Sequence, residues 1–309
     1  MELWELRQKQ SLPLEQKIIL SKERIREFYE FNDGMVYVAF SGGKDSTVLL
    51  HLVRSLYPDV PAVFVDTGLE YPEIKEFVKS INNVTTLRPE RQFKEVIESE
   101  GYPIVTKRVS MMLRDLQRPT DKNKKSREGY LSGEYSHNLT LPKLWYKLIK
   151  APFKVSDKCC NIMKKKPFVK YNKQTKTLPF IGSMASDSEA RTLTYLQTGC
   201  NSFDGKIQSI PLGFWLETDI WKYIGKYDLP YSKIYDMGET RTGCMFCMFG
   251  IHLEGTPNRF QRMAKSHPKQ YKYCIKTLGC GKVMDYIGVD YKPIKTLEEF
   301  DGMQDTGHR

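Results

Sequence analysis

The stretch from residue 36 to residue 53 constrains this chain more than any other part of it. Five strand-forming residues (36–40, VYVAF) run directly into SGGKDS at 41–46, and an apolar run typical of a helix follows at 47–53. A strand, a glycine loop and a helix start in this order aim backbone N–H groups and the positive end of a helix dipole at an anion. We therefore predict an α/β fold with a phosphate-binding loop. The alternative is a glycine turn that binds nothing.

The composition of this loop favours the first interpretation. Gly42 and Gly43 let the backbone approach a phosphate without a Cβ in the way, and Lys44 adds a cation. The spacing matches neither G-x-x-x-x-G-K-[ST] nor G-x-G-x-x-G. It resembles the PP-loop of the ATP-pyrophosphatase and phosphoadenosine-phosphosulfate (PAPS) reductase superfamily, which holds the phosphates of an adenosine nucleotide. The resemblance implies that the nucleotide is bound by Ser41, Gly42, Gly43, Lys44, Asp45 and Ser46, with Lys44 and Asp45 acting in catalysis.

Strand and helix patterns alternate along the chain. Strands are expected at 62–68, 84–88, 177–182 and 207–212, and helices at 14–31, 72–78, 93–100 and 219–227, the last with Thr218 as its cap. This order predicts a doubly wound parallel sheet, and the resemblance implies the adenine nucleotide alpha hydrolase-like form of it. Ligands of such sheets bind beyond the carboxyl ends of the strands, so Asp66 and Thr67 should face the same crevice as the loop.

Length and charge bound the organisation of the chain. The 309 residues suit a PP-loop domain over 1–250 followed by a helical and loop extension over 251–309. Residues 110–151 read as an irregular, basic insertion. Residues 107–176 hold nineteen Lys or Arg against five Asp or Glu, a surplus larger than the net +11 of the whole chain. This segment is expected to bind tRNA, DNA or another polyanion, or else to form a solvated basic face around a small phosphorylated ligand.

No run is long and apolar enough for a membrane span, and residues 1–5 lack the pattern of a signal peptide. A cytoplasmic protein with no membrane partner is therefore expected.

The seven cysteines are grouped rather than scattered. Cys159 and Cys160 are adjacent, and Cys244 and Cys247 form a C-x-x-C. Such spacing suits tetrahedral thiolate sites, and two pairs can complete a four-thiolate site for zinc or for a [4Fe–4S] cluster. The alternative is that these are buried apolar thiols.

A set of further motifs is similar to assimilatory adenylyl-sulfate (APS) reductases. The segments are KCCNIMKKKPF at 158–168, DTGLEYPE at 66–73, PLGFWLETDIWKYI at 211–224, LPY at 229–231 and RTGCMFC at 241–247. The resemblance covers about residues 36–250. It implies a [4Fe–4S] cluster on Cys159, Cys160, Cys244 and Cys247, with Lys164 near it. The family's G-x-R-x-x-x-S-x-x-R segment matches 182–191 and implies nucleotide contacts from Gly182 and Arg191.

The departures from that family concern the phosphosulfate. Met163 and Met184 stand where the family has arginines, and methionine supplies neither charge nor paired donors for an anion. The C-terminal E-C-G-L-H of the reductases is missing. Cys280 is the nearest analogue of its nucleophilic cysteine, with Cys274 as a second candidate.

Three functions remain open on these residues. The first is a PP-loop enzyme that uses ATP and Mg²⁺ to adenylylate a nucleic-acid or small acceptor and then transfers sulfur, supplied by a sulfur or electron donor protein. The second is thiol-dependent reduction of APS or PAPS to sulfite. The third is a module that binds nucleotide and cluster to sense them without turnover.

Overall fold

The computed structural model describes residues 1–133 and 139–294 of the chain. They form two compact units, each made of two separate stretches of sequence. The first unit comprises Met1–Glu90 and Lys164–Thr242, and the second comprises the described residues of the stretches that begin at Arg91 and at Gly243. The boundary expected near residue 250 separates family-like sequence from an extension. The two compact units are defined by packing instead, so that boundary stays a prediction.

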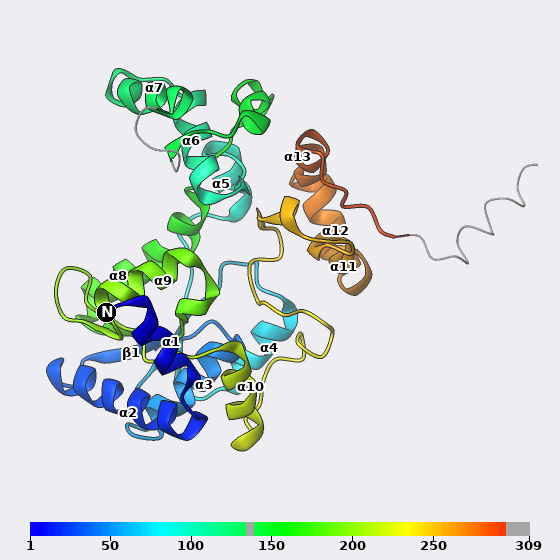
Figure 1. Cartoon of the computed structure of the whole chain (residues 1–309). Helices are drawn as coiled ribbons and strands as arrows, with labels where there is room; N and C mark the ends of the chain where they lie inside the picture. Colours follow the sequence, from blue (N-terminus) through cyan, green and yellow to red (C-terminus); the bar gives the residue numbers. More distant parts are fainter. Residues whose placement is uncertain (134–138, 295–309) are drawn as a thin grey trace, which may run out of the picture. The chain divides into compact units, whose positions relative to one another are not determined.

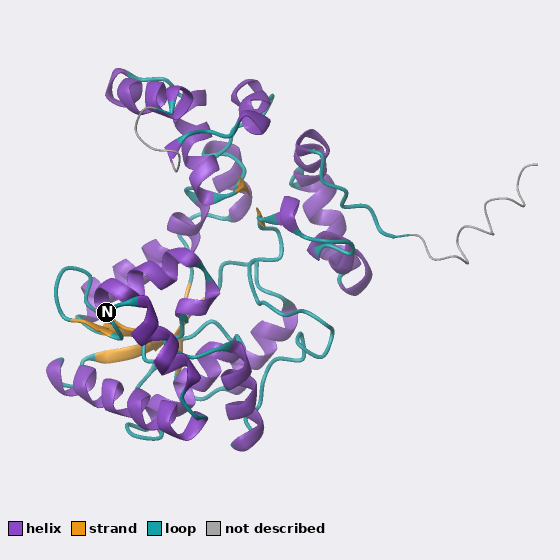
Figure 2. Cartoon of the chain, in the orientation of Figure 1, coloured by secondary structure: helices purple, strands orange, loops and turns teal. Residues whose placement is uncertain are grey.

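The first unit is built on a β-sheet with helices packed around it (Figures 1 and 2). The sheet has six strands in the order β3-β2-β1-β5-β7-β6. All neighbouring strands run parallel except the β6–β7 pair. The predicted doubly wound parallel sheet is therefore confirmed. Its strands are β1 (Val36–Ala39), β2 (Ala62–Val65), β3 (Val84–Leu87), β5 (Leu178–Ile181), β6 (Asn201–Ser202) and β7 (Gln208–Ser209).

Helices cover both faces of this sheet because successive side chains of a strand alternate between the faces. Phe180 of β5 packs edge-on against Phe28 of α2, whereas Tyr37 of β1 contacts Phe168 and Tyr171 of α8. The helices of this unit are α1 (Leu3–Ser11), α2 (Leu14–Phe31), α3 (Lys44–Arg54), α4 (Pro72–Ser80), α8 (Lys166–Thr175), α9 (Glu189–Thr198) and α10 (Glu217–Lys226).

The second unit is mainly helical (Figure 2). Its one described sheet pairs β4 (Ile104–Val105) with β8 (Met248–Phe249) in parallel. Its helices are α5 (Phe93–Ser99), α6 (Lys107–Gln117), α7 (Lys124–Ser132), α11 (Arg259–Ser266), α12 (Pro268–Lys272) and α13 (Cys280–Ile287). Shorter 3₁₀ or π turns lie at Asp121–Asn123, Lys143–Lys150, Asn161–Lys165, Ile251–Leu253 and Tyr273–Thr277.

The expectation of an irregular insertion over 110–151 is wrong for its described residues. Helix α6 begins at Lys107, where the Thr106 hydroxyl accepts the Val109 N–H, and it buries Met112 and Leu113. Helix α7 ends at Gly133 in the left-handed conformation. Helix α6 is amphipathic with few buried apolar residues, and the many Lys and Arg residues of this segment made it resemble a polar loop in the sequence. Residues 134–138 of the expected insertion lie outside the described part.

The N-terminal cap of helix α10 also differs from the expected one. It starts at Glu217 rather than Asp219, and the side chain of Asp219 accepts the Leu216 N–H at 2.8 Å, in place of the expected Thr218 cap. The same Asp219 oxygen lies 2.6 Å from Lys17 Nζ of α2, with both side chains buried. One carboxylate therefore begins α10 and docks it on α2.

Within the described ranges, no helix is both long enough and apolar enough to cross a bilayer.

We predict that Lys17→Met destabilises the fold strongly. The Lys17 and Asp219 side chains are only 1% and 9% exposed, so removing the ammonium leaves a buried, unpaired carboxylate. The loss should be about 3–5 kcal/mol in the free energy of unfolding, measured by urea denaturation. Lys226→Met is the control, because its pair with Glu15 is exposed, and its midpoint should match wild type. Equal midpoints for all three proteins would contradict this role of Lys17.

Candidate functional site

Three loops meet at one edge of the sheet because β2, β1 and β5 are parallel neighbours. Residues 41–46 follow β1, Asp66 and Thr67 follow β2, and Gly182 follows β5, whose Ile181 is paired in register with Ala39. The first unit thus brings together the predicted phosphate loop, Asp66, Thr67 and Gly182. A Cβ at Gly182 would lie 3.1 Å from the backbone N and Cα of Ser46, so this glycine permits the close approach of the third loop.

The phosphate loop has the conformation that its sequence demands. Gly42 has φ +73°, and a Cβ there would meet the side chains of Val78 and Ile74 at under 3 Å. The Ser46 hydroxyl lies 3.2 Å from the donating Ser41 N–H and donates to the Gly43 carbonyl at 2.9 Å. Helix α3 begins immediately afterwards, at Lys44, with Gly43 as its N-cap. The predicted strand–loop–helix arrangement is present.

Lys44 is a buried ammonium group with two carboxylate partners. Its Nζ lies 3.1 Å from Glu217 Oε1 and 3.4 Å from Asp45 Oδ1, and 5.7 Å from the centre of the Tyr235 ring. Burial is the largest influence on the pKa of Lys44 and by itself lowers it. Asp45, Glu217 and Tyr235 together outweigh burial and raise this pKa, so the group stays charged at neutral pH.

The surroundings disfavour the charged form of Asp45, whereas they favour the charged form of Lys44. Burial, opposed by Lys44 and reinforced by Asp187 and Glu217, raises the pKa of its carboxyl group. Its Oδ1 is buried and, beyond the 3.4 Å ion pair with Lys44, meets no hydrogen-bond donor among the described residues. Asp187 itself accepts the Met184 N–H at 3.0 Å and forms an ion pair with Arg191. The loop is thus bordered by three carboxylates from three elements, and the predicted nucleotide residue Arg191 is engaged with one of them.

The loop after β2 is fixed by its own side chains. Glu70, which is buried, accepts both the Thr67 N–H at 3.0 Å and the Thr67 hydroxyl at 2.7 Å. Asp66 pairs with Lys75 at 2.7 Å. Burial is the largest single influence on the pKa of Asp66 and raises it, but Lys75, the Gly68 N–H and Arg88 together lower it. Asp66 is therefore a stabilised carboxylate, unlike Asp45.

Sequence reasoning missed four residues at the phosphate loop: Glu217, Asp187, Tyr235 and Thr242. The Tyr235 hydroxyl accepts the Lys44 N–H at 2.8 Å, and a Cβ on Gly43 would lie 2.6 Å from Thr242 Oγ1. Residues 217 and 187 lie inside segments that the sequence had already matched to the family. Their acidic character beside a lysine loop was the available signal, but only the fold shows which of them reach Lys44.

The second unit holds six cysteines. The Cys247 N–H donates to the Cys244 carbonyl at 3.1 Å in a tight turn, and Cys159 and Cys160 lie at the start of the helical stretch that contains the π turn Asn161–Lys165. No disulfide joins any of the seven cysteines, all of which lie in the described part of the chain. Among the described residues, no three His, Cys, Asp or Glu side chains are grouped so as to hold a metal ion. The four-cysteine ligand set therefore stays a prediction.

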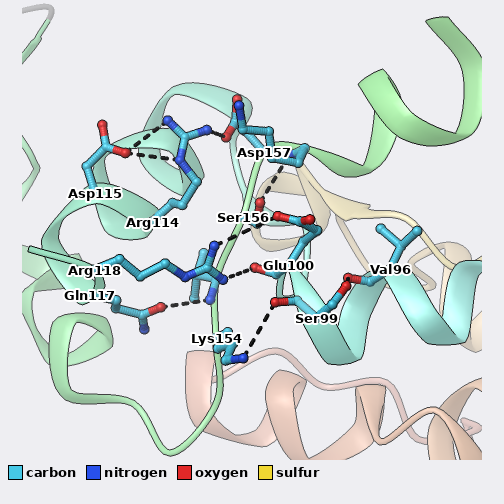
Figure 3. Close-up of polar contacts among 12 residues, drawn as sticks. Val96, Ser99, Glu100, Arg114, Asp115, Gln117, Arg118, Lys154, Ser156 and Asp157 are labelled. Atoms are coloured by element: carbon cyan, nitrogen blue, oxygen red, sulfur yellow. Dashed lines mark hydrogen bonds and ion pairs between the residues drawn. The ribbon is translucent and has the colours of Figure 1, made fainter. Parts of the chain in front are cut away.

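A polar network fixes the backbone that precedes Cys159 (Figure 3). Arg114 of α6 pairs with Asp157, and Gln117 Oε1 accepts the Val155 N–H at 2.8 Å. The fully buried Ser156 accepts the Lys158 N–H at 3.1 Å, and its own N–H donates to the Tyr102 carbonyl at 3.0 Å. The segment that presents the vicinal cysteines is thus attached to α6 and to the strand region at Tyr102.

The remaining candidate residues are less exposed than a reactive role requires. Cys274 and Cys280 are both 0% exposed, and burial, followed by the neighbouring Cys280, raises the pKa of Cys274 far above its ordinary value. Met163 and Met184 are likewise buried. Lys164 is half-buried in the π turn. The roles expected for Lys164 and Cys280 stay predictions, and burial disfavours that of Cys280.

A family profile described as the phosphoadenosine phosphosulfate reductase domain matches residues 35–112 and 116–249. The chain belongs to this family. The match spans the phosphate loop, the vicinal cysteines and the C-x-x-C, so the resemblance inferred from the motifs is confirmed.

Some of the proteins that this chain resembles are named for an activity, and others are uncharacterized. The chain is 27% identical over 227 residues to an adenosine 5'-phosphosulfate reductase of Bacillus mycoides, covering 72% of this chain and 77% of the relative. It is 25% and 27% identical to two uncharacterized proteins of Methanocaldococcus jannaschii, over 82% and 72% of this chain. It spans only 51% and 38% of the length of those two relatives.

Solved structures resemble the chain weakly. A phosphoadenylyl-sulfate reductase from Candida auris in a phosphate complex has 15% identity and a TM-score of 0.44, over 76% of this chain and 96% of that one. The U34-tRNA thiolase NcsA from Methanococcus maripaludis with its [4Fe-4S] cluster has 17% identity and a TM-score of 0.38, over 92% and 84%. At these scores neither structure carries an argument about function.

We predict that Asp45→Asn stabilises the free protein at neutral pH. A carboxyl whose folded-state pKa is raised binds more protons than in the unfolded chain, so stability falls as pH rises above its ordinary value of 3.8. The advantage of the variant should therefore be present at pH 7 and vanish below that value, as measured by urea unfolding across pH.

Asp66→Asn is the matched control and should show the opposite sign. Because the folded-state pKa of Asp66 is lowered, its charge contributes stability above the ordinary pKa, and that stability is lost as pH falls. The variant should be less stable than wild type at pH 7. If both variants shifted stability in the same direction, the electrostatic description of this site would be wrong.

Proposed function

We propose that this chain is an ATP-dependent sulfur-transfer enzyme of the PAPS reductase family. The observation that carries the proposal is the charge arrangement at the phosphate loop, where Lys44 lies between Asp45 and Glu217 with Asp187 close to Asp45. Carboxylates at the border of an anion site repel a bare sulfate ester. They suit a polyphosphate that arrives with a divalent cation.

The chemistry expected of this site is adenylylation followed by displacement. An acceptor oxygen attacks the α-phosphorus of ATP, the new P–O bond forms, and the bond to the bridging oxygen breaks so that pyrophosphate leaves. A sulfur nucleophile then attacks the activated acceptor atom and AMP departs. Lys44 and the first amides of α3 would stabilise the negative charge that develops on the pyrophosphate. Ser41 and Ser46, which hold the loop together, would fix its donors in place.

Asp45 fits the role of a magnesium ligand. Its Oδ1 is buried and has only the 3.4 Å ion pair with Lys44 among the described residues, and burial, which Lys44 offsets only in part, raises the pKa of the carboxyl group. Carboxylate oxygens are ligands that Mg²⁺ prefers. Magnesium, when bound, would offset charge on the phosphates.

The choice of ATP over APS or PAPS is supported by three side chains. Met163 and Met184 replace arginines and are buried, so neither offers a donor to a sulfate group. Arg191, the remaining arginine of that segment, is paired with Asp187. A phosphosulfate that binds Arg191 would first have to break the ion pair between Arg191 and Asp187, and this would reduce its binding free energy.

A [4Fe–4S] cluster on Cys159, Cys160, Cys244 and Cys247 is part of this proposal, with zinc as the alternative metal. All four lie in one compact unit and none of them forms a disulfide, and the tight C-x-x-C turn would supply two sulfurs to one centre. This donor set fits either group chemically. A bound cluster would supply electron transfer or a site for the incoming sulfur. The proposed partners are tRNA or DNA, bound through the basic segment 107–176 and serving as acceptor, and a sulfur or electron donor protein.

Reduction of APS or PAPS to sulfite is the second candidate function. The Bacillus relatives named adenosine 5'-phosphosulfate reductases favour it. Complete burial of Cys274 and Cys280 disfavours it, because the thiol nucleophile would have to be exposed before it could attack sulfur. A nucleotide- and redox-sensing module without turnover is the third candidate, and it differs from the first two in releasing neither pyrophosphate nor sulfite.

We predict that protein purified without oxygen is brown and contains iron and sulfide. Cys244→Ser should lose most of the visible charge-transfer absorption and the iron. Cys274→Ser is the matched control, since that cysteine lies in the same unit outside the proposed ligand set, and it should keep both. Stoichiometric zinc without iron or sulfide in the anaerobic protein would contradict the cluster.

We predict that the protein binds ATP with Mg²⁺ more tightly than APS or PAPS, by about a hundredfold if two charge-assisted contacts to sulfate are missing. Calorimetric titration at physiological salt would measure the three affinities, with Lys44→Ala expected to weaken ATP binding. Pyrophosphate release in the presence of tRNA, DNA or small acceptors tests turnover. Tight APS binding with sulfite release to a thiol would instead establish the reductase.

A further inference from the structure

The amide expected to receive a phosphate oxygen already has a partner inside the first unit. Lys44 is the first residue of α3, and its N–H donates to the Tyr235 hydroxyl at 2.8 Å. Thr242 Oγ1 lies 3.4 Å from the same hydroxyl, and the position of a Cβ on Gly43 would be only 2.6 Å from that Thr242 oxygen. Residues 235–242, which we call the strap, therefore contact the phosphate loop at both ends.

The hydroxyl of Tyr235 accepts a hydrogen bond from an N–H at the start of a helix. Backbone N–H groups at the start of a helix are unsatisfied within the helix and are the groups that bind anions. A phosphate oxygen bound to the Lys44 N–H would need the position that the phenol oxygen takes. Burial is the main influence that raises the pKa of Tyr235, so the phenol is neutral at physiological pH and accepts this hydrogen bond without charge.

An aromatic cluster supports the tyrosine from the outer side. The Tyr235 ring packs edge-on against Trp221 of α10 at 5.5 Å, and Trp221 packs in the same manner against Tyr231 at 5.4 Å. The Tyr231 hydroxyl donates to Asp236 Oδ1 at 3.1 Å, whereas the Tyr235 hydroxyl accepts the Lys44 N–H. Trp221 is partly exposed, so this cluster lies at the surface of the unit rather than in its core.

We propose that Tyr235 is a positioning residue that holds the phosphate loop in the absence of nucleotide and is displaced from the Lys44 amide when a phosphate binds. The proposal rests on the nucleotide role of the loop given above. Displacement releases the strap at Tyr235, and Thr242 is only two residues before Cys244. Nucleotide binding is thereby transmitted along the chain to the C-x-x-C turn, which links phosphate recognition to the proposed cluster ligands.

The test compares Tyr235→Phe with wild type in calorimetric titrations of ATP with Mg²⁺ and of inorganic pyrophosphate. The variant keeps the ring and its packing and removes the atom that competes for the amide, so both ligands should bind about fivefold more tightly. Tyr231→Phe is the matched control and should bind as wild type does. Unchanged or weaker binding by Tyr235→Phe overturns the proposal, as does an equal gain in both variants.

A second readout follows the movement itself. Hydrogen exchange of peptides covering 235–247 should become faster when pyrophosphate saturates the wild type, and Trp221 emission should change with the same midpoint. In Tyr235→Phe the exchange of these peptides should already be fast without ligand. Exchange that pyrophosphate leaves unchanged overturns the coupling to Cys244. If wild type binds neither ATP nor pyrophosphate, the proposed nucleotide function itself fails and this inference falls with it.

Discussion

A buried ammonium group at the beginning of a helix is the constraint on which the first unit depends. Lys44 begins α3, where the helix dipole is positive and burial removes water, and both effects disfavour a cation. Asp45 and Glu217 offset this cost. Glu217 reaches Lys44 because α10 is docked on α2 through Asp219 and Lys17, and because Trp215 donates to the buried Ser21 hydroxyl at 2.9 Å. The phosphate loop is therefore assembled by contacts that begin far from it in sequence.

This arrangement separates two carboxylates by their surroundings. Asp66 follows β2 and is compensated by Lys75, whereas Asp45 is buried beside Lys44 and two further acids. The charged form of a buried carboxyl group such as Asp45 is disfavoured in the free protein and becomes favourable when a cation binds beside it together with a ligand. The stability cost predicted at Asp45 and the proposed function are thus two aspects of one charge arrangement, and the proposed preference for ATP over a phosphosulfate rests on the same arrangement.

Local sequence patterns predicted the parts of the fold that depend on local chemistry. Strand β1, the glycine loop and α3 follow from residues 36–53 because periodicity and glycine placement decide them. The helical character of 107–132 was missed because its charged residues hide a narrow apolar face. Glu217, Asp187, Tyr235 and Thr242 could not be predicted, since their contacts with the loop arise from the packing of elements more than 140 residues away in sequence from Lys44. The ligand set of the cysteines stays a prediction, although the family that suggested it is confirmed.

We expect the acidic border of the phosphate loop to require a cation that accompanies the nucleotide. The most direct measurement is a calorimetric titration of the anaerobic wild-type protein with ATP, in magnesium and in a chelator at equal ionic strength. The account predicts that removing magnesium weakens ATP binding by about tenfold or more, because the phosphates then face Asp45, Glu217 and Asp187 without compensation. ATP binding of equal affinity in the two buffers would contradict it.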